Sequence, residues 1–293
     1  MTRVLLTGGT GFIGQRVARK LAEQGVTPCL LDLPKALHAF SLPEGWEAVE
    51  GDVTDAASVA SAMEAVDGVV HLAGIMTVDC AANPRRAFDI NLLGSLHVFE
   101  AARARKLPVA YLSSAGVYGP EDADNPHPMS IYGVTKLAVE GIARVYEADH
   151  GVPSLGLRPY IVYGPGISSG IASGPSVALA ASVKREPAVI RFSGRVGFVH
   201  VDDVARVLAA AMTGEMTGAG ILTMAGDTRE MDAFIAELMQ QTGWDGITYD
   251  GPKMRIPETL ANTPAPDWLG PQPVTTIEQG IASSLADLRG TSA

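Results

Sequence analysis

The glycine-rich segment near the start of the chain is the feature that most restricts how this chain can fold. Residues 8–14 read Gly-Gly-Thr-Gly-Phe-Ile-Gly, between an apolar run at residues 3–7 and a stretch of helical period that begins at Phe12. A strand, a glycine turn and a helix in this order open a βαβ unit. Glycine permits positive φ and close approach of the backbone to a pyrophosphate, and the helix N-terminus supplies free N–H groups. The candidate phosphate-binding residues of this predicted dinucleotide site are Gly8, Gly11, Phe12, Ile13 and Gly14.

An acidic residue ends the second predicted strand. Asp32 lies where a carboxylate can accept hydrogen bonds from the adenosine ribose hydroxyls and would repel a 2′-phosphate. The next residue is Leu33 rather than an arginine, whereas Lys35 follows closely. The sequence therefore predicts NAD as the cofactor, and Lys35 leaves the strictness of the preference over NADP open.

Short apolar runs alternate with longer segments of helical period over the first 160 residues. The predicted strands are 3–7, 28–32, 47–50, 68–72, 109–113 and 154–158. The predicted helices between them are 12–24, 56–65, 85–105 and 131–149. Because the strands are nearly all apolar rather than alternating, helices are expected on both faces of a parallel sheet. The pattern predicts an α/β fold, a Rossmann-type doubly wound parallel sheet that binds ligands at the carboxyl ends of its strands.

The second half of the chain is less regular. We expect a helix after the segment 198–204, with Asp202 or Asp203 as its N-cap, and further helices at 232–241 and 276–288 in an otherwise irregular region from 220 onward. A length of 293 residues is compatible with about two domains. The predicted cofactor domain is 1–163 plus about 197–220, and the predicted small C-terminal α/β substrate lobe is about 164–196 plus 221–293.

Charge and composition exclude several classes of function. The formal net charge of −10 disfavours nucleic-acid binding by phosphate neutralisation and disfavours an anionic membrane surface. Two cysteines and six scattered histidines match no metal-ligand spacing. No apolar run has the length of a signal peptide or of a membrane span. We therefore expect a cytoplasmic protein with a small-molecule substrate, no metal, no nucleic acid and no membrane.

A tyrosine and a lysine lie four residues apart in the predicted helix 131–149. Tyr132 and Lys136 share a helical face, and an ammonium group should lower the tyrosine pKa from its reference of about 10 toward the range of a general acid or base. Tyr249 and Lys253 have the same spacing, but Gly251-Pro252 lies between them and breaks a helix. Only the first pair is therefore a catalytic candidate.

The chain resembles the extended short-chain dehydrogenase/reductases, the NAD-dependent epimerase/dehydratase group, over most of its length. The motifs that carry the resemblance are the glycine loop 8–14, 51–55, 71–74, Asn91 with Gly94, 113–119, 132–136, 157–166, 198–206 and the tail 269–281. The resemblance implies that Tyr132 is the general acid/base and that Lys136 lowers its pKa and holds the nicotinamide ribose. It also implies that Ser114 hydrogen-bonds the reacting substrate oxygen.

The same resemblance implies further cofactor contacts and an assembly. The implied cofactor residues are Asp52, Val53, Leu72, Ala73, Gly74, Asn91 and Tyr160, besides Tyr132 and Lys136. His71 and His200 are expected to be core histidines, Arg158 to be structural, and Ser113 to cap local backbone. The helices 85–105 and 131–149 resemble the pair that forms a dimer interface in this family, so a homodimer is expected.

Two departures from the sugar-nucleotide enzymes bear on the substrate. The chain has Ile161 where those enzymes usually carry Asn, and Val196-Gly197 where they carry an Arg-Asp pair, although Arg195 lies beside it. The resemblance with these departures favours an NAD-dependent oxidoreductase that transfers hydride at a secondary alcohol of a small carbohydrate-like substrate, a sugar acid or related hydroxy acid. The candidate substrate residues are Met76, Thr77, Ser114, Ala115, Ile161 and Arg191, with Arg195, Lys253 and Arg255 as further partners for a carboxylate.

Two alternatives stay open. One is an NAD-dependent nucleotide-sugar epimerase of the UDP-glucose 4-epimerase type, with tightly bound NAD. The other is a non-catalytic NAD-sensing protein, which the presence of Ser114, Tyr132 and Lys136 disfavours.

Overall fold

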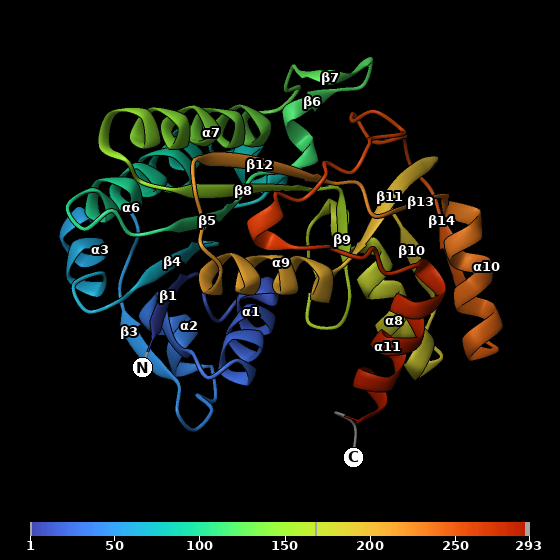
Figure 1. Cartoon of the computed structure of the whole chain (residues 1–293). Coiled ribbons are helices and arrows are strands. Elements are labelled where there is room, and N and C mark those ends of the chain that lie inside the picture. Colours follow the sequence, from blue (N-terminus) through green and yellow to red (C-terminus); the bar gives the residue numbers. More distant parts are fainter. Residues whose placement is uncertain (1, 168, 291–293) are drawn as a thin grey trace.

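Seven parallel strands form the central sheet of the computed structural model, which describes residues 2–167 and 169–290 (Figure 1). Their order in the sheet is β12-β8-β5-β4-β1-β2-β3. Their bounds are β1 (Arg3–Thr7), β2 (Thr27–Asp32), β3 (Glu47–Glu50), β4 (Gly68–His71), β5 (Val109–Leu112), β8 (Ser154–Pro159) and β12 (Ala219–Met224). Strands β2 and β3 lie on one side of β1, and β4 with the strands that follow it lies on the other side. A doubly wound fold binds its ligand at this switch between β1 and β4.

Six of the seven strands agree with the sequence prediction within one residue at each end, and the seventh corrects it. Strand β12 lies in the region expected to be irregular, yet it pairs in parallel with β8 over its whole length. It is an edge strand with a neighbour on one side only, and four of its six residues are only partly buried. Gly218 precedes the strand and Gly220 lies in its first half, and because glycine is unfavourable in strands these residues weaken the local strand signal.

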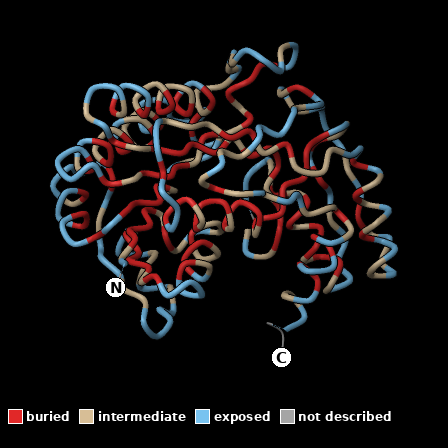
Figure 2. Tube along the Cα trace, viewed as in Figure 1, coloured by how far each residue is buried: buried red, intermediate tan, exposed pale blue. Residues whose placement is uncertain are grey.

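Helices cover both faces of this sheet. Helices α1 (Phe12–Glu23) and α9 (Val201–Thr213) pack on one face, and α3 (Ala56–Ala62), α6 (Gly94–Arg103) and α7 (Ile131–His150) pack on the other. Side chains of each strand alternate between the two cores, so Val4 and Leu6 join one core and Leu5 joins the other. Figure 2 shows the buried residues along the sheet and the inner helix faces, with exposed residues on the outer turns.

The predicted helix 85–105 contains an irregular turn. It is observed as α5 (Pro84–Ala87), a π-helical segment (Phe88–Leu93) and then α6. The short helices α2 (Pro34–His38) and α4 (Thr77–Ala82) and the hairpin β6 (Tyr118–Gly119) with β7 (Asp122–Pro126) complete this part of the chain. Because π-helical turns are frequent at functional sites, the segment 88–93 is a candidate part of the site.

Beyond the seven-stranded sheet, the described residues form two small sheets with three α-helices beside them, and the part of this region within residues 164–196 and 221–293 is called the second lobe below. Strands β9 (Ile161–Tyr163), β11 (Arg195–His200) and β13 (Asp227–Glu230) form one sheet, and β10 (Ala188–Ile190) pairs with β14 (Ile247–Tyr249). Helices α8 (Gly174–Lys184), α10 (Met231–Thr242) and α11 (Ile277–Gly290) pack beside them (Figure 1). The last two agree with the predicted helices 232–241 and 276–288. The division into two domains stays a prediction, and Met1, Ser168 and residues 291–293 of its ranges lie outside the described residues.

The N-cap of α9 differs from the prediction. The helix begins at Val201, and His200 is its N-cap, because a ring nitrogen of His200 accepts a hydrogen bond from the backbone N–H of Asp202 at 3.3 Å. Neither Asp202 nor Asp203 caps the helix, since both carboxylates lie in its first turn and bind distant segments. These long-range partners cannot be read from local sequence.

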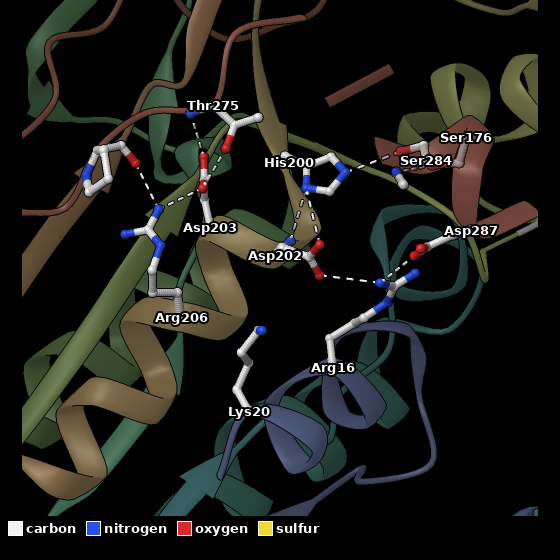
Figure 3. Close-up of polar contacts among 12 residues, drawn as sticks. Arg16, Lys20, Ser176, His200, Asp202, Asp203, Arg206, Thr275, Ser284 and Asp287 are labelled. Atoms are coloured by element: carbon white, nitrogen blue, oxygen red, sulfur yellow. Dashed lines mark hydrogen bonds and ion pairs between the residues drawn. The ribbon is translucent and has the colours of Figure 1, made fainter. Parts of the chain in front are cut away.

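Arg16 and Asp203 link helices α1 and α9 to the C-terminal part of the chain (Figure 3). Arg16 of α1 donates to Asp202 at 3.3 Å and to Asp287 of α11 at 2.8 Å. Asp203 accepts hydrogen bonds from the backbone and hydroxyl of Thr275 and from Arg206. The helix that follows the glycine loop is therefore tied to the last helix of the chain.

Candidate active site

A cavity of about 690 Å³ lies at the carboxyl ends of β1, β4, β5 and β8, at the predicted switch point of the sheet. It extends from the glycine loop to the second lobe. The predicted site residues that line it are Gly8, Gly11, Phe12, Ile13, Gly14, Leu72, Met76, Thr77, Ser114, Tyr132, Tyr160, Ile161 and Arg191. The fold thus brings most of the predicted cofactor and substrate residues to one cavity.

The glycine loop has the close packing that a dinucleotide site needs. Gly8 has φ of +67°, and a Cβ there would lie 2.9 Å from the backbone nitrogen of Ala73. A Cβ on Gly14 would lie 2.6 Å from the carbonyl oxygens of Gly8 and Gly9. Gly11 directly precedes α1 and has no side chain to cap it, so the N–H groups of the first turn are left for a ligand. These residues fit the pyrophosphate of a dinucleotide.

Asp32 fixes the glycine loop to the end of β2. One carboxylate oxygen accepts hydrogen bonds from the hydroxyl and backbone N–H of Thr10, at 2.6 and 3.1 Å, and the other accepts from Leu33 N–H at 2.9 Å. Since a carboxylate has about four acceptor positions, it can still accept from ribose hydroxyls. Asp32 itself lies beside the cavity rather than in its lining.

Ser114 and Tyr132 meet because α7 packs directly on the segment that follows β5. Ser130 is the N-cap of α7, and its hydroxyl accepts from Gly133 N–H at 3.1 Å. A Cβ on Gly133 would lie 2.1 Å from the carbonyl oxygen of Gly116, so only glycine permits this contact. The result is a hydrogen bond between the Ser114 and Tyr132 side chains.

The acidity of Tyr132 differs from the sequence expectation. Burial raises the pKa of Tyr132 to about 12, and the hydrogen bond from Ser114 opposes this only in part. Lys136 does not bring that pKa below 10, because its Nζ donates to the carbonyl oxygen of Leu112 at 2.9 Å and lies 5.6 Å from the centre of the tyrosine ring. The expected lowering is therefore wrong for this structure. Burial therefore favours the neutral phenol of Tyr132 over its phenolate in this structure.

Lys136 is itself perturbed. Its side chain is buried, and burial lowers its pKa to about 8. A Cβ on Gly74 would lie 3.7 Å from its Nζ, so the lysine is positioned against the segment that follows β4. His71 at the end of β4 is a core histidine, as expected, because its ring bonds the hydroxyls of Thr7 and Ser95. Burial and then Lys136 lower the pKa of His71 to about 3.

Asn91 supports the site from outside the cavity. It lies on the π-helical segment, is 1% exposed, and its amide accepts from Ile75 N–H at 2.8 Å and donates to Ile75 O at 3.0 Å. These two bonds hold the loop between Gly74 and Met76. Like Asn91 and Asp32, six other predicted site residues are not in the cavity lining: Asp52, Val53, Ala73, Gly74, Ala115 and Lys136.

A buried ion pair behind Ser114 was not anticipated from the sequence. Glu140 is fully buried on α7, and it accepts hydrogen bonds from Arg158 Nε at 2.7 Å, Arg158 Nη2 at 2.5 Å and Ser113 Oγ at 2.5 Å. Arg158 is thus structural, as expected, whereas the expectation that Ser113 caps local backbone is wrong. One sequence signal for Glu140 existed: it follows Lys136 by four residues, so it lies on the same helical face one turn further along.

The second lobe supplies apolar and basic side chains to the cavity. Arg191 pairs with Asp250 at 2.6 Å and Lys253 pairs with Glu258. Arg255 also lines the cavity, whereas Arg195 does not and instead donates to Thr228 O at 3.5 Å. Sequence reasoning missed several apolar residues of the lining: Met129, Ile167, Ile171, Ala172, Phe192, Met254 and Ile256. They lie in separate loops without periodicity, so no local pattern could have grouped them.

Known proteins resemble this chain in sequence. The model of the NAD dependent epimerase/dehydratase family matches residues 4–221. UDP-glucose 4-epimerase of Azospirillum brasilense is 32% identical over 248 residues, which are 76% of this chain and 71% of that protein. GDP-6-deoxy-D-mannose reductase of Pseudomonas aeruginosa is 28% identical over 97% of this chain and 96% of its own. Other relatives match in part, and the chain spans 55% of the length of Protein CapI of Staphylococcus aureus, with 32% identity over 56% of this chain.

Solved structures resemble it over the whole chain. UDP-glucose 4-epimerase of Thermotoga maritima with UDP-glucose superposes with a TM-score of 0.86 at 24% identity and covers 100% of both chains. MoeE5 in complex with UDP-glucose and NAD superposes with a TM-score of 0.84 at 25% identity, over 99% of this chain and 100% of that one. These similarities confirm the predicted Rossmann-type α/β fold. By its sequence match over most of its length, the chain belongs to the NAD-dependent epimerase/dehydratase family.

Proposed function

We propose that this protein is an NAD-dependent epimerase of nucleotide-linked sugars, of the UDP-glucose 4-epimerase type, which oxidises and re-reduces the same carbon. One observation carries the proposal: the hydrogen-bonded pair Ser114 and Tyr132 lies in a single cavity with the glycine loop at one end and basic side chains at the other. Two of the named proteins are UDP-glucose 4-epimerases, and MoeE5 was solved with UDP-glucose and NAD. These similarities support this alternative better than the sugar-acid dehydrogenase that the sequence favoured.

Each residue has a role that its position supports. NAD, when bound, takes up and returns a hydride at the reacting carbon. The glycine loop and the start of α1 hold the pyrophosphate, and Asp32 accepts from the adenosine ribose. Tyr132, as the phenolate that Lys136 stabilises, takes the proton of the substrate hydroxyl when the carbon is oxidised and returns it when the carbon is re-reduced. Ser114 holds that oxygen through both steps.

The basic side chains of the second lobe support an anionic substrate. The chain carries a net charge of −10, so a diphosphate would meet an unfavourable overall field unless local cations oppose it. Arg191, Lys253 and Arg255 line the cavity together. Among the described residues, no ion-pair partner of Arg255 is found, which leaves its guanidinium for a ligand.

The experiment is a product analysis. The purified protein with NAD is incubated with UDP-glucose, dTDP-glucose and a panel of sugar acids, and products are followed by NMR together with the absorbance of NADH. We expect a nucleotide-sugar epimer to accumulate without net NADH. Accumulation of NADH with a sugar acid, and no isomerisation of either nucleotide sugar, would contradict the proposal.

A second candidate function is that of a small-substrate dehydrogenase, and one observation favours it. Ile161 lines the cavity at the position where sugar-nucleotide enzymes usually carry Asn, so a polar partner is missing there. The same experiment separates the two, because a net dehydrogenase releases NADH in proportion to product. An NAD-sensing protein without catalysis would bind NAD and turn over none of the panel.

A further inference from the structure

The described residues of the second lobe contribute only apolar and cationic side chains to the cavity lining. The described residues of this lobe that line it are Ile167, Ile171, Ala172, Arg191, Phe192, Pro252, Lys253, Met254, Arg255 and Ile256. Seven of these ten side chains are apolar, three are cationic, and among them there is no hydroxyl, amide or carboxylate. Side-chain hydroxyls, amides and carboxylates are the groups that recognise sugar hydroxyls, so this wall offers a sugar ring little besides apolar contact.

The rest of the lining around Ser114 and Tyr132 is also poor in free polar groups. Met76, Met129, Ile161 and Val162 line it. The Tyr160 hydroxyl donates to the carbonyl oxygen of Pro257 at 2.8 Å and is thus engaged within the protein. The Ser113 hydroxyl also lines the cavity but donates to Glu140. Apart from Ser114 and Tyr132, which the reaction uses, Thr77 and Ser130 carry the remaining side-chain hydroxyls of this part of the lining.

Three large apolar side chains of the cavity lining are left open to water. Met76 is 45% exposed, Met129 is 43% exposed and Ile171 is 44% exposed. Covering such side chains with an apolar group is favourable, whereas covering them with a hydroxyl that finds no partner is not. Their gathering at one cavity indicates a ligand that places apolar surface there.

We propose that the substrate of this enzyme carries a deoxygenated sugar ring, in which hydrogen or methyl replaces at least one hydroxyl that the reaction does not use. The proposal rests on the proposed function and names the substrate class of that site. The cationic side chains bind the diphosphate, and the apolar walls enclose the deoxygenated part of the ring. An apolar pocket disfavours an added hydroxyl by about 100-fold at most, so we expect a preference of about 10- to 100-fold.

The test compares UDP-glucose with its 2-deoxy, 3-deoxy and 6-deoxy analogues, each assayed for kcat/KM with the NAD-loaded enzyme and for Kd by calorimetry. At least one deoxy analogue should exceed UDP-glucose by about 10-fold or more in kcat/KM. If UDP-glucose is the best of the four, this inference is overturned while the proposed function stands. If none is turned over, the proposed function fails, and the Kd ratios still decide whether deoxygenation improves binding; equal Kd values, or binding of none, overturn the inference as well.

A double variant and a matched control connect the preference to these walls. Met76→Gln with Met129→Gln introduces amides at exposed cavity positions, so folding should be little affected. We expect the advantage of the preferred deoxy analogue to fall to about threefold or less, because an amide can pair with the hydroxyl of UDP-glucose. Met239→Gln on α10, 48% exposed and outside the cavity lining, should leave the advantage unchanged. An unchanged advantage in the double variant would show that these walls do not set the preference.

Discussion

Burial shifts the pKa values of Tyr132 and Lys136 in opposite directions. It raises the pKa of Tyr132 to about 12 and lowers the pKa of Lys136 to about 8, so both neutral forms are favoured. The i, i+4 spacing predicted that the two side chains share a helical face, and they do. It could not predict their pKa values, because these depend on the packing of Leu112 and Ser114 around them.

Replacing the phenol tests the catalytic assignment. Tyr132→Phe should lower kcat by about 100- to 10,000-fold, because it removes the proton donor, while the Kd for NAD stays within about twofold. The measurement is steady-state kinetics with calorimetric NAD binding. Tyr249→Phe is the matched control, since Tyr249 has the same spacing to its lysine but ends strand β14 outside the cavity. Full activity of Tyr132→Phe would refute the role given to this residue.

The buried lysine should leave a signature in stability. Because the folded-state pKa of Lys136 lies below its unfolded value of about 10.4, the unfolded chain binds more protons between these values, and stability should rise with pH there. Lys136→Met removes this dependence. From about pH 7.5 to about pH 9.5, the unfolding free energy of the wild type should gain about 2 kcal/mol relative to Lys136→Met. Urea unfolding at both pH values measures it, and a difference that stays constant would show that Lys136 titrates normally.

At the scale of elements, the central strands and the glycine loop were predictable, since each has a strong local signal. The edge strand β12 and the cap of α9 were not, because their form depends on β8 and on Arg16 and Thr275, which are distant in sequence. Many apolar residues of the cavity lining come from the segments 167–172 and 252–256 of the second lobe, which carry no periodicity. Local pattern therefore predicted the cofactor half of the site better than the substrate half.

The ion pair between α7 and β8 should be important for stability. Glu140→Ala leaves Arg158 without its carboxylate in a largely buried position, so we expect a loss of about 3–5 kcal/mol in the free energy of unfolding. Chemical denaturation measures this loss. Asp149→Ala, at an exposed position of the same helix, should change stability by about 0.5 kcal/mol or less. A small effect at Glu140 would mean that the pair is not needed to join α7 to the sheet.

At the scale of the whole molecule, the described part of the chain has no helix long and apolar enough to cross a membrane. The two lobes are tied together through Arg16, Asp202 and Asp287 (Figure 3). The helix that starts at the glycine loop thereby contacts the last helix of the second lobe. A cytoplasmic location stays a prediction.

The predicted homodimer can be tested on α7. Val134 and Val145 are 38% and 53% exposed there, on one of the two helices expected at the interface. Light scattering should give the mass of two chains, and Val145→Glu should shift the protein toward a single chain because it places a charge in an apolar contact. Val189→Glu on β10, also exposed, is the control. A wild-type protein with the mass of one chain would contradict the dimer.

In the proposed reaction, the hydride leaves one carbon of the sugar and returns to that same carbon while the cofactor stays bound. The most direct measurement uses UDP-glucose with deuterium at C4, incubated with the NAD-loaded enzyme in ordinary water, and follows the label by NMR and mass spectrometry. We expect an epimer that retains its deuterium, with no labelled NADH free in solution. Deuterium found in released NADH, or lost to water, would contradict it.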